Sequence, residues 1–269
     1  MGTLWRQWQY GNKPPLGARP IPGHPLAPRI SWLMNEGSGS YLNNACGRGS
    51  DFTVGGAAPA PWTATRDGIA VQPYLTAGTT VPQCSLEAFP ASAFPMTVIV
   101  GAVDSDTGAG ALADYSTGGN DGWKLLLLDD GTLRFSLSGV AHYSFTGVVS
   151  AGGNITAACT VTGNGGTATG YLFNESALLT AQATIGTMGG TPTLFRVGTD
   201  SFGNNWTAPI KYCSFYDVVL GADSIASLTA QPYQFLECPS FAVSMFVPSG
   251  GATPVFPYPL FLSSRRRAA

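Results

Sequence analysis

The sequence predicts an all-β protein, an antiparallel β-sandwich flanked by extended N- and C-terminal arms. The chain of 269 residues contains 35 Gly and 20 Pro but only 10% charged residues, far below the usual share of about 25%. This composition disfavours long solvated helices. With 44% apolar residues the chain can still bury a large core. Short β-rich runs separated by turn residues recur through its middle, the pattern expected of a sandwich or barrel.

The first segment, residues 1–29, is predicted to be an extended arm. Six prolines within residues 13–28 exclude a helix or a central strand there, because each fixes φ and removes a backbone donor. The arm has basic residues, no acid, and aromatic side chains that disordered linkers seldom contain. We expect the arm to lie along another protein surface. Its candidate contact residues are Trp5, Arg6, Trp8, Tyr10, Arg19 and Arg29.

Residues 30–230 are predicted to form the sandwich. The clearest local signal is Asp129-Asp130-Gly131, because an Asp-Gly pair between two apolar, strand-like runs favours a tight hairpin. Asn164-Gly165-Gly166 predicts a second hairpin for the same reason. Strands are expected at 96–103, on both sides of the turn within 123–139, and at 154–163, 167–174, 193–200 and 208–220.

A short helix is expected at 221–229, with Asp223 as its N-cap and Ile225 and Leu228 buried. Residues 231–269 are predicted to be a second extended arm. This segment mixes proline with apolar residues that have no amphipathic periodicity, and it carries three consecutive arginines near its end. Its candidate contact residues are Phe256, Tyr258, Phe261, Arg265, Arg266 and Arg267.

Several short motifs follow one another in an informative order. Residues 30–40, ISWLMNEGSGS, come first, Gly122-Trp123-Lys124-Leu125 then leads into the Asp-Gly turn, and the segments 195–200 and 210–220 follow. This order resembles the laminin-G-like, concanavalin A-like jelly-roll domains. The resemblance covers roughly residues 30–230 and implies a jelly-roll sandwich.

The segment after the sandwich, Gln231-Pro232-Tyr233-Gln234-Phe235, together with the proline-rich lead, resembles virion proteins of tailed bacteriophages. This resemblance implies a non-enzymatic capsid decoration, or cement, protein. Its partners would be the major capsid protein and neighbouring copies of itself in a homo-oligomer. It would be made in the bacterial cytoplasm and would lie on the capsid surface of the virion.

The distribution of charge supports binding through the arms. Residues 31–239 hold all 15 acids but only six of the 13 basic residues, whereas both ends of the chain are free of acids. Basic arms find acidic partner surfaces readily, since complementary charge aids encounter and register. The acidic body disfavours nucleic acid as a partner, although Arg265-Arg266-Arg267 would suit phosphates.

The alternative is a carbohydrate-binding, lectin-like fibre or host-attachment module. In that reading Trp62, Trp123 or Trp206 stacks on sugar rings. Each of these tryptophans lies in or beside a predicted strand, so burial in the core competes with this role.

Catalysis is not expected. A resembling glucanase would carry a Glu-x-Asp-x-Glu strand, because glycoside cleavage uses two carboxyl groups about 5–10 Å apart. The sequence has no Glu-x-Asp, and its four glutamates are isolated. It also lacks the P-loop, G-x-S-x-G and H-E-x-x-H motifs. We therefore expect neither enzyme activity nor catalytic residues.

No cofactor or metal is expected either. Ca²⁺ would find oxygen ligands in two loops, but all of the candidates are also ordinary turn formers. They are Asp104, Asp106 and Asp114 in the first loop and Asp200, Asn204 and Asn205 in the second. Five scattered cysteines without a C-x-x-C pair favour thiols in a reducing compartment over zinc ligands. The longest apolar run, residues 125–128, is too short for a membrane span.

Overall fold

The computed structural model of this chain describes most of the region between residues 13 and 237. The described ranges are 13–14, 18–36, 41–46, 52–54, 62–65, 68–72, 82–85, 94–103, 109–117, 121–137, 141–145, 153–174, 177–190 and 192–237. Contacts divide the chain into the units Met1–Pro239 and Ser240–Ala269, and every described residue belongs to the first.

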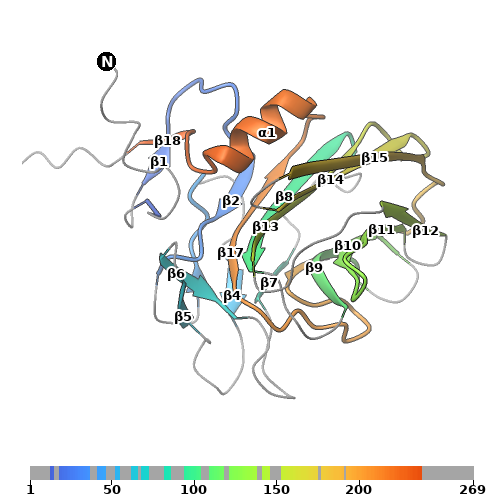
Figure 1. Cartoon of the computed structure of the whole chain (residues 1–269), viewed down its shortest axis with the longest axis horizontal. Helices are drawn as coiled ribbons and strands as arrows, with labels where there is room; N and C mark the ends of the chain where they lie inside the picture. Colours follow the sequence, from blue (N-terminus) through green and yellow to red (C-terminus); the bar gives the residue numbers. More distant parts are fainter. Residues whose placement is uncertain are drawn as a thin grey trace, which may run out of the picture. The chain divides into compact units, whose positions relative to one another are not determined.

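Sheet I has eight antiparallel strands in the order β12-β11-β10-β9-β16-β7-β4-β3. Its strands β12, β11, β10 and β9 lie side by side in Figure 1. Its hairpin β10–β11 turns at Gly131, whose φ of 76° suits glycine, so the predicted Asp-Gly hairpin is confirmed. In sheet order the strands are Ala141–Phe145, Leu133–Leu137, Trp123–Leu127, Gly110–Tyr115, Leu194–Val197, Pro82–Ser85, Phe52–Val54 and Tyr41–Leu42.

Sheet II follows the order β15-β14-β13-β8-β17-β6-β5, and β2 also pairs with β17. Its hairpin β13–β14 turns at Gly165, with a φ of 75°, as predicted. In sheet order the strands are Ala177–Thr184, Thr167–Asn174, Asn154–Val161, Met96–Val103, Ile210–Tyr216, Gly68–Val71 and Trp62–Thr65, and β2 is Ile30–Trp32. The all-β antiparallel sandwich predicted from the sequence is confirmed.

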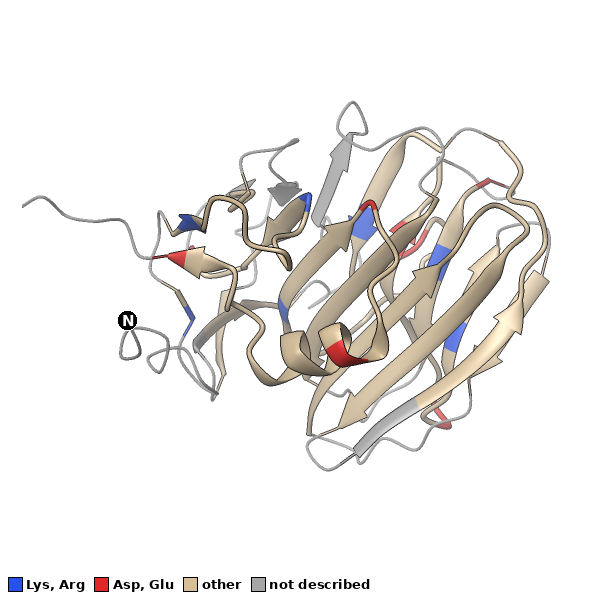
Figure 2. Ribbon diagram, turned by 90° about the horizontal axis from the view of Figure 1, so that it is seen from above, with Lys and Arg blue, Asp and Glu red and all other residues tan. Residues whose placement is uncertain are grey.

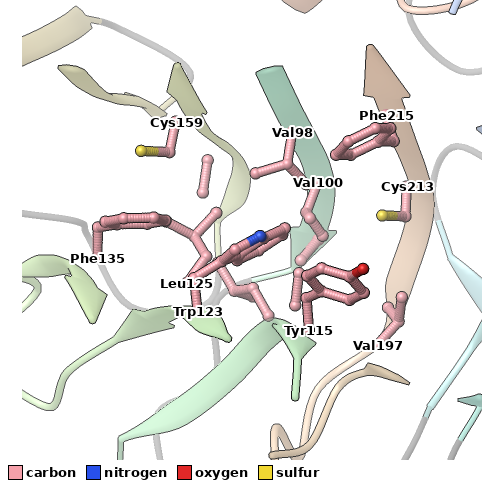
Figure 3. Close-up of a cluster of buried hydrophobic side chains, with 14 of the residues drawn as sticks. Val98, Val100, Tyr115, Trp123, Leu125, Phe135, Cys159, Val197, Cys213 and Phe215 are labelled. Atoms are coloured by element: carbon pink, nitrogen blue, oxygen red, sulfur yellow. The ribbon is translucent and has the colours of Figure 1, made fainter. Parts of the chain in front are cut away.

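The main core fills the space between the two sheets (Figure 3). Trp123, Leu125 and Phe135 of sheet I point toward Val98 and Phe215 of sheet II, and all five side chains are buried. Alternation along β10 explains this arrangement, because every second residue of a strand faces the same side. The residues between these core positions therefore face outward from the sandwich.

A second apolar cluster covers the outward face of sheet II. Ile99 and Tyr212 lie on this face, and helix α1, Ala222–Ala230, packs Ile225 and Leu228 against the same cluster. The cluster also includes Phe235. The outward face of sheet II also carries buried hydroxyl groups, such as those of Ser31 and Ser214, whose Oγ atoms lie 2.8 Å apart. The charged residues of the described strands lie mostly in sheet I.

The helix is confirmed, but the prediction that Asp223 caps it is wrong. The N-cap is Gly221, in extended conformation and without a side-chain hydrogen bond, and Asp223 lies in the first turn. A carboxylate there still complements the helix dipole. The described part of the chain contains no helix with the length and apolar character needed to cross a bilayer.

Segments near both ends of the described chain pair with each other. Strand β1, Arg19–Pro20, is antiparallel to β18, Leu236–Glu237, and Ile21 N donates to Phe235 O at 2.8 Å. The described residues of the two predicted arms thus contact each other. The predicted boundaries at residues 29 and 230 stay predictions, as does the partner-binding role of the arms.

Candidate functional site

A row of polar residues crosses the outward face of sheet I. Its five members lie directly opposite one another on β12, β11, β10, β9 and β16. We call this set the polar row; it consists of His142, Ser136, Lys124, Asp114 and Arg196. Among the described strand residues of the two sheets, the other charged positions are Arg134 on β11 and Lys211 on β17, and Figure 2 shows how sparse the charges are. The polar row is therefore a concentrated set of charges on a weakly charged sandwich.

Asp114 and Arg196 form an ion pair within this row. Arg196 Nη1 donates to Asp114 Oδ2 at 2.7 Å, and Ser116 Oγ donates to Asp114 Oδ1 at 2.8 Å. The Asp114 side chain is fully buried. Burial raises the pKa of Asp114 to about 6, because its effect exceeds that of the Ser116 hydrogen bond and of the nearby Arg196 and Lys124 charges.

Lys124 pairs with a different carboxylate, in the loop that follows β16. Its Nζ donates to Asp200 Oδ2 at 3.1 Å and to Ser201 Oγ at 3.2 Å. Both members of the ion pair are almost completely buried, with 5% and 1% of their side chains exposed. The loop therefore lies over the outward face of β10, and a buried charge pair fixes it there.

Asp200 also organises the loop itself. Its Oδ1 accepts hydrogen bonds from Phe202 N at 2.8 Å and Asn204 N at 3.0 Å, and its Oδ2 accepts one from Asn204 Nδ2 at 2.7 Å. Burial by itself would raise the pKa of Asp200. The hydrogen bonds from Asn204 and Phe202 and the Lys124 charge outweigh burial and lower the pKa.

Phe202 is the most exposed large apolar side chain in the described part of the chain, with 64% of its surface accessible. The Lys124 Nζ lies over its ring, 3.7 Å from the centroid. This is a cation–π contact, in which the ammonium is attracted to the electron-rich face of the ring. The loop thus presents an aromatic ring to solvent beside the polar row.

The tryptophans predicted to stack on sugars do not form such a surface. Trp123 and Trp206 are buried in the core, with 0% and 1% of their surfaces exposed, and Trp62 on β5 is half-buried. Sugar stacking on Trp123 or Trp206 is therefore wrong, because the residues packed around them exclude a ligand. The one sign of Phe202 in the sequence is its position in a turn rich in Gly and Asn.

The predicted arm residues lie partly within the described structure. Arg19 Nε lies 3.3 Å from Glu237 Oε1, and Arg29 Nη1 lies 3.0 Å from Asp217 Oδ2. Their contact with a partner stays a prediction. The other arm residues lie outside the described residues; they are Trp5, Arg6, Trp8, Tyr10, Phe256, Tyr258, Phe261, Arg265, Arg266 and Arg267.

Two of the candidate calcium ligands meet, because Asn204 Nδ2 donates to Asp200 Oδ2 at 2.7 Å, but the described candidates already have other partners. Asp114 pairs with Arg196, whereas Asp200 pairs with Lys124, and Asn205 Oδ1 accepts a hydrogen bond from Thr199 Oγ1 at 2.6 Å. Asp104 and Asp106 lie outside the described residues. Within the described ranges, no group of three His, Cys, Asp or Glu side chains is placed to hold a metal ion.

Neither a protein-family model nor a curated protein matches this sequence. Solved structures do match the fold. A Trypanosoma rangeli sialidase in complex with sialic acid matches with a TM-score of 0.54 and 12% identity, over 76% of this chain and 32% of that chain. This chain thus spans about a third of the sialidase. Domain 4 of AbnA, a GH43 extracellular arabinanase from Geobacillus stearothermophilus, in complex with arabinotriose, matches with a TM-score of 0.53 and 12% identity, over 80% of this chain and all of that chain.

These matches correct one expectation. The sequence-based exclusion of enzyme activity is contradicted, because the same fold occurs within sialidase chains and as a domain of an arabinanase. At 12% identity the similarity shows the fold alone and assigns no reaction to this chain. The jelly-roll-like sandwich is supported, whereas the bacteriophage origin stays a prediction.

Proposed function

We propose that this chain is a carbohydrate-binding β-sandwich. The observation that carries the proposal is the exposed Phe202 ring beside the polar row on the outward face of sheet I. Carbohydrate sites combine an aromatic surface with a few oriented polar groups, because a sugar ring has both apolar C–H faces and hydroxyl groups. Both features meet here on one sheet face.

The comparisons support this class of ligand. Domain 4 of the arabinanase is matched along its whole length and was solved with arabinotriose, and the sialidase was solved with sialic acid. These ligands belong to those proteins. Sandwiches of this shape thus occur in proteins that hold sugars, which favours sugars as the class of ligand for this chain.

A glycan array tests the proposal. The full chain is applied to immobilised neutral and acidic oligosaccharides, and each hit is measured by titration calorimetry with the soluble sugar. We expect at least one oligosaccharide class to bind with a Kd below about 1 mM, the usual weak limit of such measurements. The absence of any glycan above background at that limit would refute the proposal.

A place on a virion surface is a second proposal. It is supported by the two acid-free, aromatic-rich ends of the sequence, which suit extended contact with acidic neighbours. Deletion of residues 240–269 is then expected to leave a folded monomer that no longer occupies particles, whereas undiminished occupancy would contradict this role.

A further inference from the structure

The loop that carries Phe202 is fixed by a buried cation from outside the loop. Lys124 reaches three consecutive loop residues: it donates to Asp200 and Ser201 and lies against the ring of Phe202. Asp200 in turn accepts two backbone N–H groups of the loop. A cation that neutralises a loop carboxylate whose oxygens also organise the backbone is in the position that a bound Ca²⁺ occupies in many loops.

A single exposed phenylalanine would need no explanation, since surfaces carry isolated apolar side chains. Phe202 differs because one face of its ring contacts an ammonium group that is itself buried. Cation–π attraction is strongest for such desolvated cations, and so the ring is held in one orientation. A ring that is already ordered loses little further entropy when a ligand stacks on it.

We propose that Phe202 is the sugar-stacking platform of this sandwich, that Lys124 is its positioning residue in place of a metal ion, and that the ligand is a neutral sugar. This inference rests on the proposed carbohydrate-binding function. It specifies where the sugar lies, what holds the site together, and which class of sugar it accepts.

The neutral class follows from the charge balance around the platform. Lys124 is paired with Asp200, and Arg196 with Asp114, so each of the two cations of the polar row already has a carboxylate partner. An acidic sugar would have to compete with a buried, hydrogen-bonded carboxylate for either cation. A neutral sugar makes no such demand. Its hydroxyl groups suit the side chains of Ser201 and Asn204, which are close to Phe202 in the sequence of the loop. Ser201 Oγ accepts from Lys124 and can still donate, and Asn204 Nδ2 donates to Asp200 while its Oδ1 can still accept.

The first test removes the platform. Phe202→Ala is expected to weaken binding of the neutral array glycans by about tenfold or more, and Phe202→Trp to retain it, because only the second keeps an aromatic face. Val218→Ala is the matched control, since Val218 is also an exposed apolar residue, at 49%, but lies after β17. Unchanged binding in Phe202→Ala, or binding of acidic glycans alone, would overturn the proposal.

The second test removes the cation. Lys124→Met keeps the aliphatic stem and loses the ammonium, and it is expected to weaken binding by about tenfold, with Lys124→Arg closer to the unmodified chain. Lys211→Met is the matched control, because Lys211 is similarly buried, at 8%, but on sheet II. Binding by the unmodified chain is expected to be the same in EDTA and in CaCl₂, and loss of binding in EDTA would overturn the role of Lys124.

Amide hydrogen exchange separates this inference from the proposed function, because it needs no sugar. In Lys124→Met the Phe202 and Asn204 amides are expected to exchange about tenfold faster, while the amides of the β10–β11 hairpin keep their protection. Unaltered exchange at these two amides would refute the positioning role, even in a protein that binds glycans. Faster exchange in a chain that binds no glycan would instead refute only the proposed function and the sugar platform.

Discussion

The stability of this protein is expected to rise as the pH falls from about 7 to about 4.5, because of Asp114. The ordinary pKa of an aspartate is 3.8, and burial raises that of Asp114 to about 6 in the folded chain. Between these two values the folded state holds a proton that the unfolded state has released. Protons therefore favour folding in this range, and the contribution is lost as the pH rises through the folded pKa.

The size of the effect follows from the shift. A displacement from 3.8 to about 6 corresponds to roughly 3 kcal/mol in full, of which about 2 kcal/mol is recovered between pH 7 and pH 4.5. That is a large part of the roughly 5–15 kcal/mol by which domains are commonly stable. Asp114→Asn removes the titrating group and keeps the shape of the side chain.

Urea unfolding of both proteins across this pH range measures the effect. The quantity to compare is the difference in unfolding free energy between the two proteins at each pH, because His24 contributes to both. Burial lowers the pKa of His24, so this residue makes the fold less stable as the pH falls below neutral, opposite to Asp114. Relative to Asp114→Asn, the unmodified chain should gain about 2 kcal/mol on acidification. A difference that stays constant with pH would mean that Arg196 keeps Asp114 ionised in the fold, which would refute the dominance of burial.

Two further predictions concern packing and buried hydrogen bonds. A Cβ on Gly170 would overlap the Phe145 ring, so Gly170→Ala should lower the free energy of unfolding by about 1–3 kcal/mol. Gly163→Ala is the control, because Gly163 has open space around it. Equal losses of the two variants in urea unfolding would contradict this reasoning. The buried Thr97 hydroxyl donates to Val218 O at 2.8 Å and accepts from Leu220 N at 3.0 Å, both in the segment between β17 and α1. Thr97→Val should therefore lower the free energy of unfolding by about 1–3 kcal/mol. A thermal unfolding midpoint equal to that of the unmodified chain would disprove this prediction.

The features that the sequence predicted correctly are local ones. The hairpins at Gly131 and Gly165 depend on turn residues next to each other in the chain, and both glycines have the positive φ that such turns require. The burial of Trp123 and Trp206, which their positions in or beside predicted strands favoured, likewise depends on nearby residues. Turn chemistry and side-chain periodicity act over short distances, and so they can be recognised without knowing the sheet order.

The candidate site could not be predicted in the same way, because it depends on which strands are neighbours. Lys124 and Asp200 are 76 residues apart, and Arg196 and Asp114 are 82 apart. They meet because β9 lies between β10 and β16 in sheet I. The same non-local pairing explains why Asp200, a plausible calcium ligand by composition, has a lysine as its partner instead.

The ion pairs of Arg19 and Arg29 bear on the predicted role of the arms. Both arginines belong to the acid-free N-terminal segment, yet they pair with Glu237 and Asp217, so part of the charge separation along the sequence is cancelled in the fold. The four side chains are between 36% and 64% exposed. Exposed pairs of this kind contribute about 0–1 kcal/mol each, because water screens them. A partner with acidic groups would therefore displace Glu237 or Asp217 at little cost, and the two arginines keep their capacity for the predicted contact.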